Sequence, residues 1–140
     1  MVKVQRLFAK TNLKIQVWRI EKIGIFRIKE REKMYKNVEK QTKIELKDLV
    51  SYQEGQVVSK TLVQNDYVSM TIFSFDKGEE ISTHAAGGDA MVTVLEGKGR
   101  FTVADEVFYL EKGETLIMPK DIPHAVYGEE KFKMQLVVSY

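Results

Sequence analysis

Two segments decide the fold of this chain: residues 78–97, GEEISTHAAGGDAMVTVLEG, and residues 113–124, GETLIMPKDIPH. Each begins with a glycine, continues through residues that favour β-strands, and contains one histidine. These histidines, His84 and His124, are the only two in the 140 residues. The shared order of turn glycine, strand and histidine is the strongest signal in the sequence.

Short β-prone runs follow one another through the rest of the chain. The breaks between them carry glycine, asparagine or aspartate, which tolerate the positive φ of tight hairpins. A short helix or turn is expected at residues 45–52, and no long helical period follows it. The spacing predicts an all-β sandwich or barrel. Strands are expected at residues 57–63, 67–75, 80–84, 90–95, 100–103, 106–110, 115–118, 124–127 and 131–139.

Two of these runs indicate how their strands are buried. The last run alternates apolar and polar residues, so Phe132, Met134, Leu136 and Val138 should point inward. The run at residues 67–75 is apolar on both faces. We therefore expect its outer side to be covered, and a dimer partner is a candidate for that cover.

Composition limits the class of protein. The length indicates one domain that buries its own core. The absence of cysteine excludes disulfides and thiolate metal sites and fits a reducing compartment. No apolar run approaches the roughly 18 residues of a membrane span, and the first residues lack the apolar core of a secretory signal. We expect a cytoplasmic protein that does not act at a membrane.

Charge is distributed unevenly. Residues 1–43 hold 13 Lys or Arg and 4 Asp or Glu, a net charge of +9, whereas residues 44–140 hold 9 and 16, a net charge of −7. We expect a basic N-terminal extension at 1–43, with a short strand at 13–17, followed by one domain at 44–140. Three interpretations of the extension are open. It is a basic binding arm, or it is a structural arm that pairs with a partner subunit. Alternatively, residues 1–33 lie upstream of the natural start, which is then Met34.

The two segments resemble the paired motifs of the cupin superfamily, small β-barrels that usually hold a divalent metal. The first family motif is a glycine, five residues, His-x-His, three or four residues, a glutamate, six residues and a glycine. Gly78, His84 and Gly97 match this motif. Ala86 stands at the second histidine and Ala90 at the glutamate.

The second family motif is a glycine, five residues, Pro-x-Gly, two residues, a histidine, three residues and an asparagine. Gly113, Pro119 and His124 match it, while Asp121 replaces the second glycine and Gly128 the asparagine. The chain looks most like small single-domain cupins with a His-Ala-Ala stretch in the first motif. This resemblance implies an all-β jelly-roll (double-stranded β-helix) barrel behind the N-terminal extension, and a homodimer.

The resemblance also implies that His84 and His124 converge inside the barrel. Two imidazoles can bind Zn²⁺, Ni²⁺, Fe²⁺, Mn²⁺ or Cu²⁺, although such sites generally use at least three protein ligands. Asp89 is a candidate third ligand, but it lies one position before the glutamate site, where strand alternation directs it outward unless the preceding glycines shift the register. The expected ligand pocket is lined by His84, His124, Ala86, Ala90 and Met134.

Three functions are compatible with these residues. The first is a small-molecule-binding cupin in which the histidines are polar anchors and hold any metal. The second is a metal-dependent cupin enzyme of the dioxygenase, decarboxylase or isomerase type. The third is a ligand-sensing regulatory module, although residues 1–43 lack a helix-turn-helix pattern and nucleic acid is not an expected partner. Without a metal, the histidines serve as acid–base groups or hydrogen-bond partners, or are structural.

Overall fold

The computed structural model describes residues 34–140, and the strand expected at residues 13–17 lies outside them. Every strand expected within the described part is confirmed, with ends that agree within two residues, and a short 3₁₀ helix, η1 (Leu46–Leu49), precedes them. The strands are β1 (Val57–Gln64), β2 (Val68–Phe75), β3 (Glu80–His84), β4 (Asp89–Glu96), β5 (Lys98–Val103), β6 (Glu106–Glu111), β7 (Thr115–Met118), β8 (His124–Gly128) and β9 (Phe132–Ser139).

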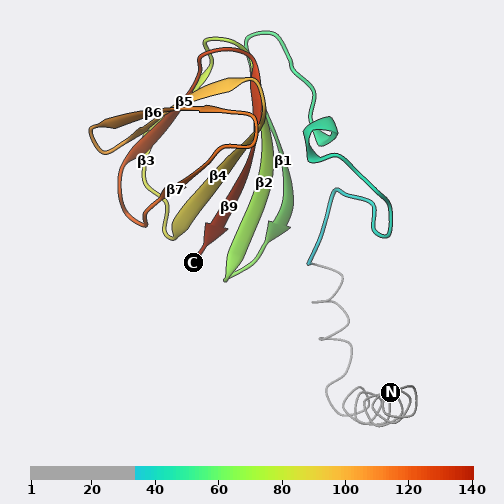
Figure 1. Cartoon of the computed structure of the whole chain (residues 1–140). Coiled ribbons are helices and arrows are strands. Elements are labelled where there is room, and N and C mark those ends of the chain that lie inside the picture. Colours follow the sequence, from blue (N-terminus) through green and yellow to red (C-terminus); the bar gives the residue numbers. More distant parts are fainter. Residues whose placement is uncertain (1–33) are drawn as a thin grey trace, which may run out of the picture. The chain divides into compact units, whose positions relative to one another are not determined.

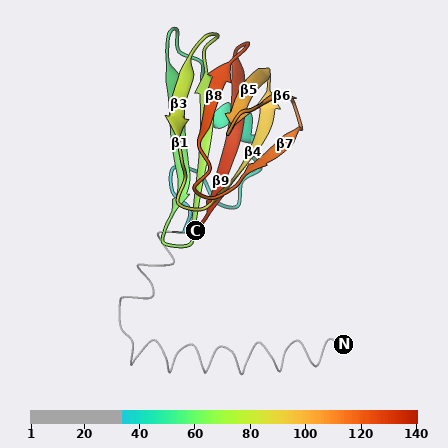
Figure 2. The same ribbon diagram turned by 90° about the vertical axis from the view of Figure 1, so that its left-hand side faces the viewer.

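The strands form two antiparallel sheets that face each other (Figure 1). The larger sheet has the order β1-β2-β9-β4-β7, and the smaller has the order β3-β8-β5-β6. Figure 2, turned by 90°, shows β8 between β3 and β5 in the smaller sheet. Strands that are neighbours in the chain thus often belong to opposite sheets, as in the expected jelly-roll barrel.

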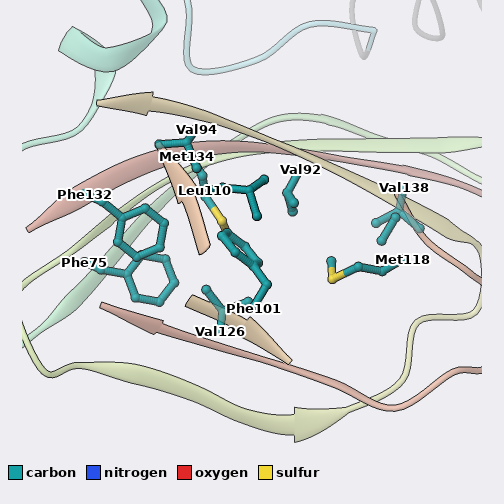
Figure 3. Close-up of a cluster of buried hydrophobic side chains, with 11 residues drawn as sticks. Phe75, Val92, Val94, Phe101, Leu110, Met118, Val126, Phe132, Met134 and Val138 are labelled. Atoms are coloured by element: carbon teal, nitrogen blue, oxygen red, sulfur yellow. The ribbon is translucent and has the colours of Figure 1, made fainter. Parts of the chain in front are cut away.

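The core lies between the two sheets (Figure 3). The alternation predicted for the last strand is confirmed, because Phe132, Met134 and Val138 of β9 are buried there and Leu136 packs against them. The rings of Phe75 and Phe132 stack at 4.6 Å between centroids. These aromatic and branched side chains fill the centre of the sandwich.

A second apolar cluster covers the outer face of the larger sheet. Ile72 of β2 is fully buried there together with Val50, and Val38 and Leu46 pack against the same cluster. The expected cover over the outer side of β2 therefore comes from the chain's own residues before β1. These residues belong to the compact unit, which comprises Tyr35–Tyr140.

Polar contacts fasten this covering segment to the sheet. The Lys133 ammonium on β9 donates to the carbonyl of Lys47 at 2.7 Å, lies 3.3 Å from the Glu96 carboxylate, and stands 4.9 Å from the centroid of the Tyr52 ring. The Tyr52 hydroxyl donates to Glu96 at 3.0 Å. Burial alone would raise the pKa of Glu96, but the hydrogen bonds from Tyr52 and Lys133 outweigh it and hold that pKa below its usual range. We call Lys47, Tyr52, Glu96 and Lys133 the clamp.

One motif glycine has a clear steric role. Gly97, in the turn between β4 and β5, has φ of +76°, a conformation that L-residues rarely adopt. A Cβ atom built at this position would lie 1.9 Å from the carbonyl oxygen of Lys131. The turn therefore requires glycine for its dihedral angle and for the close approach of two backbone segments.

Candidate functional site

The structure brings the two histidines together at one end of the barrel. His84 ends β3 and His124 begins β8, and the two residues are register partners in the smaller sheet. The register shifts by one residue between Ile81 and His84, since Ile81 pairs with Val126. This bulge places both imidazoles on the core-facing side, with ring centroids 4.4 Å apart and ring planes 67° apart.

The same local hydrogen bond orients each ring. Nδ1 of His84 lies 2.8 Å from the carbonyl oxygen of Ser82, and Nδ1 of His124 lies 3.0 Å from that of Ile122. A carbonyl oxygen can only accept, so each neutral ring carries its proton on Nδ1 and donates it. Each Nε2 then presents a lone pair and bonds to no other group in the described part of the chain.

The two rings differ in solvent exposure. His124 is 3% exposed, whereas His84 is exposed at the barrel end. Burial lowers the pKa of the His124 imidazole below its ordinary value; the hydrogen bond to Ile122 opposes this, and the neighbouring His84 lowers the pKa further. The His124 ring is therefore neutral at physiological pH and offers Nε2 as an acceptor or metal ligand.

Asp89 is engaged elsewhere. Its carboxylate accepts a hydrogen bond of 2.8 Å from the backbone N–H of Lys120, and the side chain is exposed at the start of β4. The backbone N–H of Asp121 donates to the carbonyl of Ala86 at 3.0 Å. Asp89 thus joins the loop after β7 to the loop before β4, and the two sequence motifs are fastened together beside the histidines.

The remaining predicted pocket residues lie at different depths. Ala90 is buried on β4, and Ala86 packs against the same core. Ala90 pairs with Val138 of β9, and Met134 lies four residues before Val138 on the same strand. This separation corresponds to roughly 13 Å along β9. The methionine directly opposite Ala90 is Met118. The structure therefore places Met118, which is not among the expected pocket residues, nearer the histidines than Met134 along the sheet.

The donor set does not complete a metal centre of three protein ligands. Within residues 34–140, no three His, Cys, Asp or Glu side chains lie close enough together to hold a metal ion. His84 and His124 supply two imidazoles, and alanines occupy the two other motif positions. The site is suited to accepting hydrogen bonds, and a metal there would need further ligands from solvent or substrate.

Sequence reasoning missed the groups that orient the rings. The carbonyls of Ser82 and Ile122 each lie two residues before a histidine, but backbone groups leave no composition signal. No helix within residues 34–140 is long and apolar enough to cross a membrane.

Comparison with known proteins identifies the fold and its relatives. The family model described as Cupin domain matches residues 71–140. A conserved protein of unknown function from Streptococcus pyogenes is 42% identical, with a TM-score of 0.74 over 76% of this chain and 93% of that one. A cupin superfamily protein from Desulfitobacterium hafniense is 31% identical, with a TM-score of 0.72 over 75% and 96%.

A more distant similarity concerns the fold alone. A salicylate 1,2-dioxygenase variant from Pseudoaminobacter salicylatoxidans is 21% identical, with a TM-score of 0.56 over 59% of this chain and 26% of that one. No curated protein matches the chain. The grouping by a His-Ala-Ala stretch stays a prediction.

Proposed function

The chain belongs to the cupin superfamily, and we propose that it is a small-molecule-binding cupin whose ligand is anchored by His84 and His124 at one end of the barrel. One observation carries the proposal. Two imidazoles from different strands lie 4.4 Å apart, and both leave Nε2 without a partner among the described residues. Glu129 Oε2 is the one fully buried side-chain nitrogen or oxygen without a hydrogen-bond partner among the described residues, so Nε2 of His124 reaches solvent although its ring is largely buried. A ligand at this end of the barrel could therefore donate a hydrogen bond to it.

The surroundings of the pair support a binding role. Ala86 and the buried Ala90 lie on the core side of the loop and strand that follow His84, with Met118 opposite Ala90. Ligand sites commonly combine an apolar wall with a few polar groups that fix orientation. The small alanine side chains leave the two imidazoles as the main polar groups of this wall.

A metal-dependent enzyme is less well supported by the residues. The two imidazoles provide half of a four-ligand set, and Asp89 already accepts a hydrogen bond from Lys120. A divalent metal held by two histidines would exchange readily with solution. The ligand-sensing module, the homodimer and the cytoplasmic location stay predictions.

Binding to the full chain tests this function. A library of small polar fragments would be screened by ligand-observed NMR against the wild type, the His84→Gln/His124→Gln variant and a Lys112→Ala variant in an exposed turn. We expect hits that bind wild type and Lys112→Ala equally and lose at least tenfold in affinity in the histidine variant. Equal affinity for all three proteins would refute the assignment, provided that circular dichroism shows the same fold.

Metal content of the same proteins tests the alternative. Protein purified without chelator would be measured by plasma mass spectrometry. Substoichiometric metal in the wild type is expected. One metal per chain, lost in the histidine variant, would favour the enzyme class instead.

A further inference from the structure

The smaller sheet carries a third polar group in register with the histidine pair. His84 pairs with His124, His124 pairs with Val103 of β5, and Val103 pairs with Glu106 of β6. Val103 and Phe108 both pack against the inner core, so Glu106 lies on the core-facing side of its strand. A carboxylate therefore stands on the same row of the sheet as the imidazoles, two strands from His124.

The larger sheet contributes hydroxyl groups at the same end. Ser69 and Thr71 alternate along β2 with residues that pack in the outer cluster, so they lie on the inner side. Ser69 is 8% exposed, and the Tyr140 hydroxyl donates to its Oγ at 3.4 Å. The backbone N–H of Tyr140 donates to the carbonyl of Tyr67, which fixes Ser69 where β9 ends and β2 begins. Thr71 lies further along β2, and its Oγ1 is 3.2 Å from that of Thr61.

Positive charge is absent from the core-facing positions of the nine strands. Strand alternation places every lysine and arginine of these strands on the outer face of its sheet. Lys133, for example, belongs to the clamp, and Cζ of Arg100 lies 4.2 Å from the centroid of the Tyr127 ring. The loops and strand ends around the histidines are acidic. Among the described residues, the loops and strand ends at this end of the barrel carry Asp66, Asp89, Asp105, Glu106 and Asp121 against one cation, Lys120.

These features select against anionic ligands. The imidazoles offer lone pairs on Nε2, and the hydroxyls accept as readily as they donate. The carboxylates at this end of the barrel favour a negative potential around the two rings. A carboxylate or phosphate would lose its hydration shell without meeting a cation on these strands. A hydroxyl group, by contrast, finds acceptors on both sides.

We propose, on the basis of the function proposed above, that the ligand is an uncharged molecule with two or more hydroxyl groups that donate to Nε2 of His84 and His124, and that carboxylates and phosphates are excluded. Glu106 acts as a specificity residue by repelling anions from this end of the barrel. The apolar body of the ligand lies toward Ala90 and Met118.

Three matched probes test the ligand class: cis-1,2-cyclohexanediol, 1,2-dimethoxycyclohexane and cyclohexanecarboxylate. Full-length protein with ¹⁵N-labelled histidine gives two imidazole spin systems, because the chain has two histidines. We expect both rings in the Nδ1–H form, saturable shifts with the diol, and at least tenfold weaker binding of the ether and the carboxylate. An Nε2–H ring, or a carboxylate that binds as tightly as the diol, would overturn the proposal.

Charge reversal tests the role of Glu106. Glu106→Lys should raise the affinity for cyclohexanecarboxylate at least fivefold, whereas Glu111→Lys, at the other end of β6 and beside Lys98, should not change it. An unchanged affinity in Glu106→Lys would remove Glu106 from the proposal. Failure of all three probes to shift the imidazoles would refute the hydroxyl class, while the fragment screen with the double histidine variant decides separately whether the site binds small molecules.

Discussion

Replacement of Lys133 by methionine tests whether the clamp holds the covering segment on the sheet. The change removes a charged hydrogen bond to the Lys47 carbonyl, worth about 1.5–3 kcal/mol. It also removes the ion pair with Glu96 and the contact with the Tyr52 ring, each worth about 0.5–1 kcal/mol at partly exposed sites. Methionine keeps an apolar stem in the same place and recovers about 1 kcal/mol. We expect a net loss of about 1.5–4 kcal/mol in the free energy of unfolding.

Urea denaturation of the full chain measures this loss, and hydrogen exchange locates it. The exchange of the Asp48 amide, which donates to Glu45 within the η1 turn, should accelerate more than that of amides in β9. Lys131→Met is the matched control, because Lys131 is 60% exposed, contacts the same Tyr52 ring from 5.8 Å and should cost about 0.5 kcal/mol or less. A Lys133→Met protein that loses no more stability than this control would refute the reasoning.

Three further changes probe the turn, the buried imidazole and the loop contact. Gly97→Ala should lower the free energy of unfolding, measured by urea denaturation, by at least about 3 kcal/mol. Gly55→Ala should lower it by about 1 kcal/mol, because Gly55 has φ of +65° but nothing within 4 Å of the new Cβ. Equal losses in the two variants would contradict the steric argument. The free energy of unfolding should fall as the pH drops from 6.5, the ordinary histidine pKa, through the lower pKa of His124 in the folded protein. In this range the unfolded chain binds more protons than the folded chain. If a His124→Asn protein loses stability equally with falling pH, His124 is not the cause. Asp89→Ala should cost about 0.5–1.5 kcal/mol through loss of the acceptor for the Lys120 N–H, while Asp89→Asn, which keeps an oxygen, should cost less; the reverse order would show that the contact is not the cause.

The strand pattern could be read from the sequence because it depends on local chemistry. Turn glycines and aspartates mark the hairpins, and the alternation in β9 gives its buried face directly. The cover over Ile72 could also be anticipated from the two apolar faces of β2. Its source in residues 38–50 could not, because apolar surface signals burial without specifying the partner.

The arrangement of the site depended on long-range pairing. The bulge after Ile81 determines that His84 faces His124, and a bulge has no reliable signature in one sequence. For the same reason the sequence could not indicate that Met118 lies nearer Ala90 than Met134 does, because both distances depend on strand register. Strand alternation indicates that Asp89 points outward, and the side chain is exposed. Its hydrogen bond with the backbone N–H of Lys120 could not be predicted, because Lys120 lies 31 residues later in the chain.

The local orientation of each imidazole has an evolutionary consequence. Because His84 and His124 are each held by the carbonyl of the residue two positions earlier in the chain, neither ring needs the other, nor a bound metal, to keep its direction. Coordinating side chains can therefore be lost or regained at Ala86 and Ala90 one substitution at a time, while the two rings keep the orientation of two metal ligands. The same independence makes this barrel a convenient starting scaffold for building new chemistry around a fixed pair of nitrogen donors.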